Sequence, residues 1–291
     1  RLAEELAPGA LTRDDVADHG VDLFLRAVVG DGGGREEQAE AGGGAERSER
    51  GDVLLDPHAD AAGHAPAVGV GGQRGRSPPG EAEELKRAFN ERFWTDARGG
   101  YYVLALDGEK RQVDSLCSNI GHLLWSGIVP ADRVDIVTDR LMGEELWSGW
   151  GVRTMSTGDA GYNPLSYHNG TVWPHDNSLI AHGLGINSRW PEAQRIVRRM
   201  LGAASHFGNQ LPEVFAGLPR AETPFPIAYP TAARPQAWAA GTPLLLLRLL
   251  LGLEPNTAER RLGTLAGAMP PDGVSLSLQG VRGFGRSWDV T

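Results

Sequence analysis

Two carboxylates, each in an aromatic-rich segment, are the residues of this sequence best suited to chemistry. Asp176 lies in WPHDN, and Glu213 lies between apolar neighbours in LPEVF, where partial burial would demand a partner. Glycoside hydrolysis needs such a pair, because one carboxyl protonates the leaving oxygen and the other activates water or attacks the sugar. Two structural interpretations stay open: Asp176 can be the N-cap of a helix, and Glu213 can be a solvated loop acid.

The segments around the two acids carry rings and hydrogen-bonding groups. Gly161–Leu184 contains aromatic, imidazole and amide side chains: Tyr162, Asn163, Tyr167, His168, Asn169, Trp173, His175 and Asn177. Gly208–Pro235 holds six prolines and adds Phe215, Phe225 and Tyr229. Aromatic rings suit the apolar faces of sugars, and loops on a rigid scaffold often carry binding groups. Both segments therefore favour a polar ligand such as a sugar.

The remaining reactive residues do not form a known motif. His168, His175 and His182 lie seven residues apart, which does not match the zinc pattern of two histidines four apart on one helix. Cys117 has His122 nearby but sits in an apolar run, which favours a buried structural thiol. No phosphate-binding glycine loop is present. We expect no metal and no cofactor.

Composition narrows the class of protein. The 291 residues carry a formal net charge of -9, which argues against nucleic acid or an anionic membrane as a partner. The single cysteine excludes an intrachain disulfide and fits a reducing compartment, so a cytoplasmic location is expected. The longest apolar run, Pro243–Leu253, is interrupted by Arg248 and is too short to span a bilayer.

Residues 1–80 differ from the rest of the chain. They hold 16 of the 40 glycines and one aromatic residue, Phe24, and runs such as GDGGGREEQAEAGGG have no helical or strand periodicity. Low hydrophobicity with high charge does not offset the entropy of ordering a chain, so this segment is predicted to be disordered. It is either a terminal linker or a stretch that does not belong to the natural fold.

From residue 81 onward the sequence is predominantly helical. Apolar spacing predicts helices at 81–94, 115–126, 130–143, 177–185, 191–206 and 236–252. The last of these is apolar nearly all round and is expected to be buried. Short strands are expected at 101–107 and as a pair within 269–291. Loops of about 20 residues alternate with brief turns, and such long loops are usually functional. An α/α toroid, whose long loops gather over one mouth of a ring of helical hairpins, would produce this rhythm.

Several consecutive motifs resemble a known family. The motifs are DSLCSNIGHLLWSGIV, LWSGWGVRTMST, YNPLSYHNGTVWPHDNSLIAHGL, LPEVFAG and YPTAARPQAWAAGTPLLLLRLLLGL. In order and spacing they resemble the C-terminal part of bacterial amylo-alpha-1,6-glucosidases, the glycogen-debranching type of six-hairpin glycosidase. The resemblance runs from about Glu81 to Gly252 and does not include residues 1–80. It implies an all-α, (α/α)6 catalytic domain over residues 81–291.

The resemblance also implies roles for individual residues. Asp176 matches the expected general acid, and Glu213 matches the expected general base. Matches to positions that line the sugar pocket are Trp150, Arg153, Tyr162, Asn163, His168, Asn169, Trp173, Gln236 and Trp238. The family is expected to invert configuration, which implies carboxyl groups about 6.5–9.5 Å apart with room for a water molecule. An oligosaccharide or polysaccharide with α-linked glucose is the implied substrate, and other α-glycosides, such as mannosyl-glycerate substrates, remain open.

The number of helices departs from that family. A complete (α/α)6 ring has twelve helices, whereas six or seven are predicted here, so the chain resembles the C-terminal half of such an enzyme. The missing N-terminal half is then a possible partner, and the isolated half would expose apolar helix faces. Two alternatives follow: an inactive or carbohydrate-binding fragment of such an enzyme, and a helical-repeat interaction protein, against which the aromatic loops argue.

Overall fold

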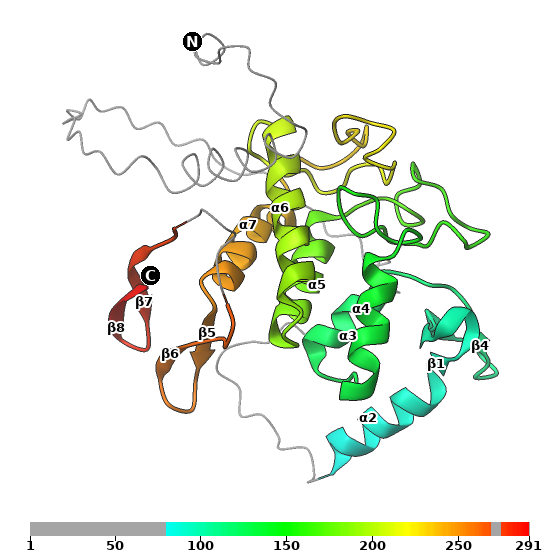
Figure 1. Cartoon of the computed structure of the whole chain (residues 1–291), viewed down its shortest axis with the longest axis horizontal. Helices are drawn as coiled ribbons and strands as arrows, with labels where there is room; N and C mark the ends of the chain where they lie inside the picture. The colour runs from blue at the N-terminus through cyan, green and yellow to red at the C-terminus, as the bar shows by residue number, and fades with distance from the viewer. Residues whose placement is uncertain (1–79, 269–274, 291) are drawn as a thin grey trace, which may run out of the picture. The chain divides into compact units, whose positions relative to one another are not determined.

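The computed structural model describes residues 80–268 and 275–290 (Figure 1). The predictions made for residues 1–79 lie outside these ranges. The described residues from Glu83 onward belong to one compact unit, and all packing described below lies within it.

The described residues are rich in helix, as predicted. Six α-helices are present among them: α2 (Glu81–Arg92), α3 (Asn119–Ser126), α4 (Val134–Met142), α5 (Pro174–Ile186), α6 (Trp190–His206) and α7 (Ala237–Leu250). Short 3-10 turns lie at Ala97–Gly99 and Ala131–Arg133. Four antiparallel strand pairs complete the set: β1 (Trp94–Thr95) with β2 (Tyr101–Tyr102), β3 (Ala105–Leu106) with β4 (Gln112–Val113), β5 (Leu253–Asn256) with β6 (Arg261–Thr264), and β7 (Leu278–Gly283) with β8 (Arg286–Val290). The last pair confirms the terminal strands expected within 269–291.

Helix α5 lies at the centre of the helical packing and contacts α3, α6 and α7. Two glycines allow α3 and α5 to approach closely. A Cβ at Gly121 would lie 2.6 Å from the Ile180 side chain, and one at Gly183 would lie 2.8 Å from the backbone nitrogen of Trp125. Because real Cβ atoms do not approach other atoms so closely, larger side chains at either position would force the helices apart.

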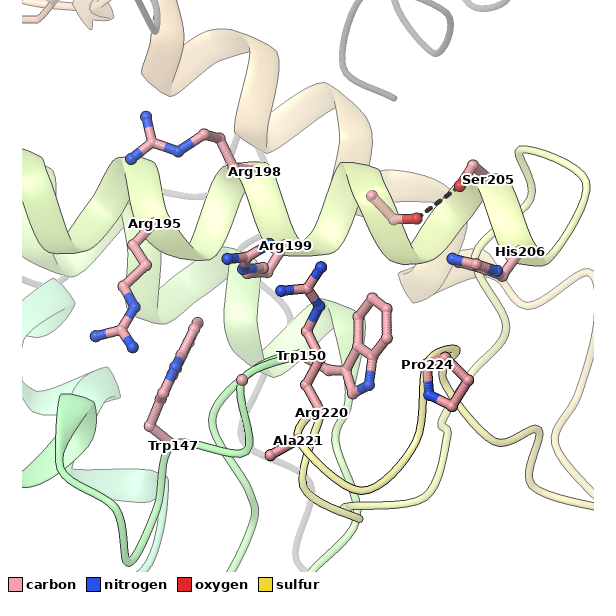
Figure 2. Close-up of a pocket in the computed structure, with 12 residues that line it drawn as sticks. Trp147, Trp150, Arg195, Arg198, Arg199, Ser205, His206, Arg220, Ala221 and Pro224 are labelled. Carbon is pink, nitrogen blue, oxygen red and sulfur yellow. Dashed lines mark hydrogen bonds between the residues drawn. The ribbon is translucent and has the colours of Figure 1, made fainter. Parts of the chain in front are cut away.

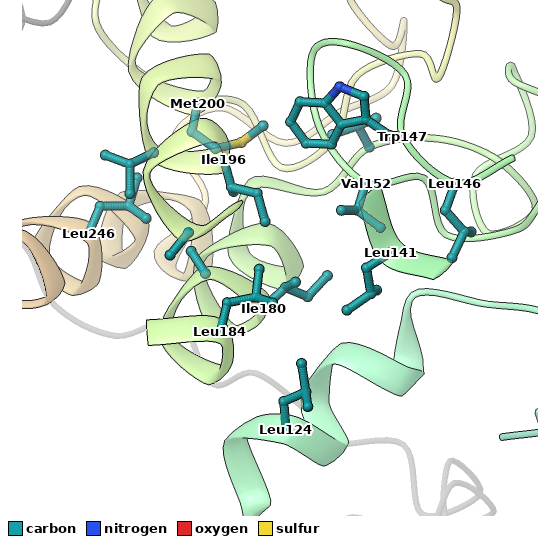
Figure 3. Packing of buried hydrophobic residues seen from close by; sticks show 14 of the residues in the cluster. Leu124, Leu141, Leu146, Trp147, Val152, Ile180, Leu184, Ile196, Met200 and Leu246 are labelled. Atoms are coloured by element: carbon teal, nitrogen blue, oxygen red, sulfur yellow. The ribbon is translucent and has the colours of Figure 1, made fainter. Parts of the chain in front are cut away.

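Helix α6 is amphipathic, and its apolar side closes the core. Ile196, Val197 and Met200 are fully buried, while Arg195 lies on the exposed side. Figure 3 shows the buried side chains of α6 meeting those of the neighbouring elements, with Leu124 from α3, Ile180 and Leu184 from α5 and Leu246 from α7. Each such side chain contributes roughly 1.5–3 kcal/mol through its removal from water.

Two expectations about the helices were wrong. Helix α5 begins at Pro174, so Asp176 lies in its first turn, and the N-cap position is Trp173, whose side chain makes no capping bond. Proline at the first helical position needs no N–H partner and has a helical φ, which explains the earlier start. Helix α7 is not buried all round, because Trp238 and Leu244 are 61% and 65% exposed. Among the described residues α7 contacts α5, α6 and β5, and its buried side chains include Ala239, Leu246 and Leu249.

Isolated antiparallel bridges join the loops above the helices. Arg153 pairs with Val172, Val172 with Phe215, and Phe215 with Ala228. Two backbone hydrogen bonds connect Val172 and Phe215, at 2.9 and 3.0 Å. Segments far apart in sequence are therefore held next to the start of α5. None of the described helices is both long and apolar enough to cross a membrane.

Candidate active site

Glu213 is held by hydrogen bonds to both of its carboxylate oxygens. The hydroxyl of Tyr167 donates to Oε1 at 2.7 Å, and the backbone N–H of Ala233 donates to Oε2 at 3.1 Å. The bond to Glu213, together with burial and the carboxylate charge, raises the pKa of Tyr167 to about 12. Glu213 is therefore a positioned carboxylate rather than a free loop acid.

Rings gather beside this carboxylate. The Tyr167 ring lies 4.8 Å from Trp173, 4.6 Å from His168 and 5.6 Å from Tyr229, measured between centroids. The rings of His168 and Trp173 are stacked at 5.8 Å with an interplanar angle of 7°. The Trp173 indole N–H donates to the carbonyl of Tyr167 at 3.1 Å, which fixes the orientation of the indole. This aromatic cluster, Tyr167, His168, Trp173 and Tyr229, offers flat surfaces next to a carboxylate.

Asp176 has one engaged oxygen and one without a partner. Its Oδ1 is hydrogen-bonded to His122 Nε2 of α3. Its Oδ2 is buried and has no hydrogen-bond partner among the described residues, and the side chain is 14% exposed. Burial lowers the pKa of His122, but the hydrogen bond and the charge of Asp176 outweigh this, and the pKa of His122 is raised.

The two carboxylates lie beyond the same end of one backbone bridge, Val172–Phe215. Glu213 lies two residues before Phe215, and Asp176 lies four residues after Val172. Because the two segments run antiparallel, the chain at Glu213 passes beside the start of α5, whose first turn carries Asp176.

Asn177 ties a further loop to this point. Its Oδ1 accepts the N–H of Val152 at 2.7 Å, and its Nδ2 donates to the carbonyls of Val152 and Trp173 at 3.1 and 3.0 Å. The residue is fully buried. Asn177 therefore fixes the loop that carries Trp150 and Arg153 to the helix that carries Asp176.

Arg153 and Gln236 bond to the backbone. The Arg153 guanidinium donates to the carbonyls of Gly217 and Glu144 at 2.7 and 3.2 Å, and burial lowers its pKa. The Gln236 side chain caps α7 by accepting the N–H of Ala239 at 2.7 Å. Both residues shape the loops around the carboxylates.

Other predicted pocket residues lie in two places, one near Asp176 and one in the loop before the aromatic cluster. Trp238 lies on α7, and the centre of its ring is 4.9 Å from that of His175. His175 directly precedes Asp176 in the sequence. Asn163 pairs with Asn169 through a backbone hydrogen bond of 2.8 Å, which closes the loop before the aromatic cluster. Tyr162 lies in the same loop, and burial raises its pKa.

Trp150 lies elsewhere, in a cavity of about 500 Å³ beside α6. None of the aromatic-cluster residues lines that cavity. Figure 2 shows the Trp150 ring among arginine side chains from α6 and from the loop at Arg220.

Sequence reasoning did not identify His122, Tyr167 and Asn177 as partners of the candidate acids. His122 lies 54 residues from Asp176, and Tyr167 lies 46 residues from Glu213. No local spacing signals such pairs. Cys117, in contrast, is a free buried thiol as predicted, and burial raises its pKa. No group of three or more metal-ligating side chains is found within residues 80–268 and 275–290.

The helix-rich fold suits a glycoside hydrolase, and comparison with protein families agrees. The family model of the mannosylglycerate hydrolase MGH1-like glycoside hydrolase domain matches residues 59–215, which is more than half of the chain. The chain therefore belongs to this family of glycoside hydrolases. A search of curated proteins found no match. The predicted glycoside hydrolase class is confirmed, whereas the debranching type receives no support from a match that names a mannosylglycerate hydrolase.

Proposed function

We propose that Asp176 and Glu213 are the catalytic pair of an inverting hydrolase that cleaves α-glycosidic bonds. The observation that supports this proposal is that the segments carrying the two acids run side by side past one end of the antiparallel Val172–Phe215 bridge, where Tyr167 of the aromatic cluster bonds to Glu213. The rings of Tyr167 and Trp173 can receive the apolar face of a sugar. No metal or cofactor takes part in the proposed reaction.

The hydrogen bonds suggest how the two acids divide their roles. His122 engages Oδ1 of Asp176, which leaves Oδ2 to carry the proton for the leaving glycosidic oxygen; because Oδ2 is buried, this step requires the side chains that cover it to move when a substrate binds. Glu213 accepts hydrogen bonds from Tyr167 and from the backbone N–H of Ala233, which hold both of its oxygens in place. An ionised carboxylate is what a general base needs to take a proton from the attacking water.

Two substrate classes are proposed. The resemblance in the motifs favours α-linked glucan, including α-1,6 branch points, whereas the family match favours a mannosylglycerate-like α-glycoside. Assays that measure the sugar released from isomaltose and from mannosylglycerate distinguish the two substrate classes.

The catalytic roles are tested with Asp176→Asn and Glu213→Gln, using Glu222→Gln as the matched control from the same loop. Each of the first two substitutions should lower kcat by about 10³-fold or more, because an asparagine cannot donate the proton to the leaving oxygen and a glutamine cannot accept the proton of the attacking water. Glu222→Gln should retain activity. Full activity in Asp176→Asn would refute the assignment of the acid.

We also propose that the helices form half of an (α/α)6 toroid, which sequence outside residues 81–291 or a partner chain completes. The exposed Trp238 and Leu244 on α7 support this, because a neighbouring helix would cover them. An inactive, carbohydrate-binding fragment is the second candidate, and the same exposed side favours it. Sugar binding without hydrolysis, unchanged in Asp176→Asn and Glu213→Gln, would support that candidate.

A further inference from the structure

The cavity beside α6 is unusually rich in positive charge. Its lining includes Arg195, Arg198 and Arg199 from α6, Arg220 from the loop opposite, and His206. None of the described residues that line it is an aspartate or glutamate. The whole chain has a formal net charge of -9, so this concentration of cations does not follow from composition.

Two tryptophans orient the arginines. The Arg195 guanidinium lies 4.6 Å from the centre of the Trp147 ring, and that of Arg220 lies 5.1 Å from the centre of the Trp150 ring. The indoles are firm supports, since Trp147 and Trp150 are only 8% and 4% exposed. A guanidinium stacked on a ring still presents N–H donors along its edge, in a geometry that matches carboxylate and phosphate oxygens.

Two of these arginines have no carboxylate partner in the described part of the chain. Arg195 and Arg198 form no ion pair with any described carboxylate. Burial and the positive charge of Arg220 lower the pKa of His206, so the imidazole of His206 lies within the electrostatic field of Arg220.

The size and shape suit a small molecule. A volume of about 500 Å³ falls within the range of about 300–1,000 Å³ that is typical of ligand pockets. Figure 2 shows Arg195 and Arg220 directed toward the two indoles, whereas Arg198 extends away from them. The cavity walls contain neither Asp176 nor Glu213, so the site is separate from the proposed catalytic pair.

We propose that this cavity binds a small metabolite through a phosphate or carboxylate group, with Arg195 and Arg220 as its main contacts. The shared chemistry is an oxyanion that receives paired N–H donors from guanidinium groups. The proposal does not depend on glycoside hydrolysis, because binding at this site is measured without turnover.

Isothermal titration calorimetry on the full chain at constant ionic strength tests the proposal. The probes are glucose 6-phosphate, citrate and uncharged glucose. We expect glucose 6-phosphate or citrate to bind and glucose not to bind at this site. Binding of the phosphate ester alone identifies a phosphate ligand, and binding of citrate alone identifies a carboxylate ligand. Absence of binding by both anions at millimolar concentration would overturn the proposal.

Variants locate the binding. Arg195→Gln and Arg220→Gln should each weaken the anion by about tenfold to a hundredfold, as expected for loss of charged hydrogen bonds. Arg92→Gln is the matched control, because Arg92 is an exposed arginine of α2 that does not line the cavity, and it should change affinity less than about twofold. Arg195→Lys should retain an intermediate affinity, because it keeps the charge but not the paired donors. Equal weakening by Arg92→Gln and Arg195→Gln would mean non-specific attraction and would refute a built site.

Discussion

Replacing Asn177 with alanine tests whether the loops of the candidate site depend on one buried amide. The substitution removes three hydrogen bonds, to the N–H and carbonyl of Val152 and to the carbonyl of Trp173. Val152 is fully buried, so its two backbone groups lose their partner without gaining water. The net value of a hydrogen bond is about 1 kcal/mol, and a buried unsatisfied group costs about 1–3 kcal/mol.

One net hydrogen bond, to Trp173, and two unsatisfied backbone groups, both of Val152, together predict a loss of about 4 kcal/mol in the free energy of unfolding. For a domain of this size the loss corresponds to a fall in Tm of roughly 10 °C. Urea titration and thermal unfolding followed by circular dichroism measure both quantities. Gln210→Ala serves as the control, because Gln210 is exposed, and should change stability by less than about 0.5 kcal/mol. A loss below about 1 kcal/mol in Asn177→Ala would show that the loop at Val152 is held by other contacts.

Two further predictions concern packing and pH. A Cβ at Gly217 would lie 1.7 Å from the carbonyl oxygen of Gly170, so Gly217→Ala should destabilise the protein by about 3 kcal/mol. A Cβ at Gly202 in α6 meets nothing within 4 Å, so Gly202→Ala should stabilise the protein by about 0.5–1 kcal/mol. Urea titration measures both changes, and a loss of stability in both variants would contradict the argument. The pKa of His122 is raised in the folded protein, so its contribution to stability is fully present below its unfolded pKa of about 6.5 and is lost as pH rises through the folded pKa. The difference in Tm between the wild type and His122→Gln should therefore shrink from pH 5.5 to pH 8.5. A difference in Tm that grows over this range would mean that the pKa of His122 is lowered by folding.

The sequence predicted the elements whose signals are local. Helix α6 follows from its apolar periodicity, and the observed helix, Trp190–His206, begins one residue before the predicted one. The segments that carry Asp176 and Glu213 also follow from local composition, since rings and acids are close neighbours in each. The glycoside hydrolase class followed from motifs of this kind.

Contacts between distant segments could not be predicted in the same way. The pairing of Asp176 with His122 and of Glu213 with Tyr167 depends on which helices and loops pack together. Helix α7 illustrates the limit, because its apolar residues predict burial, but exposure of Trp238 is decided by which neighbours are present.

The sequence by itself determined that the chain is rich in helix from residue 81 onward, that two acids lie in segments rich in aromatic rings, and that the glycosidase class fits those motifs. These properties depend on residues close together along the chain, where periodicity and composition are informative. Only the tertiary structure decided that His122 engages one oxygen of Asp176, and that arginines from α6 and from the loop at Arg220 meet in one cavity. The physical reason is that side-chain partners and cavities arise from packing between segments, and packing is a property of the folded chain as a whole.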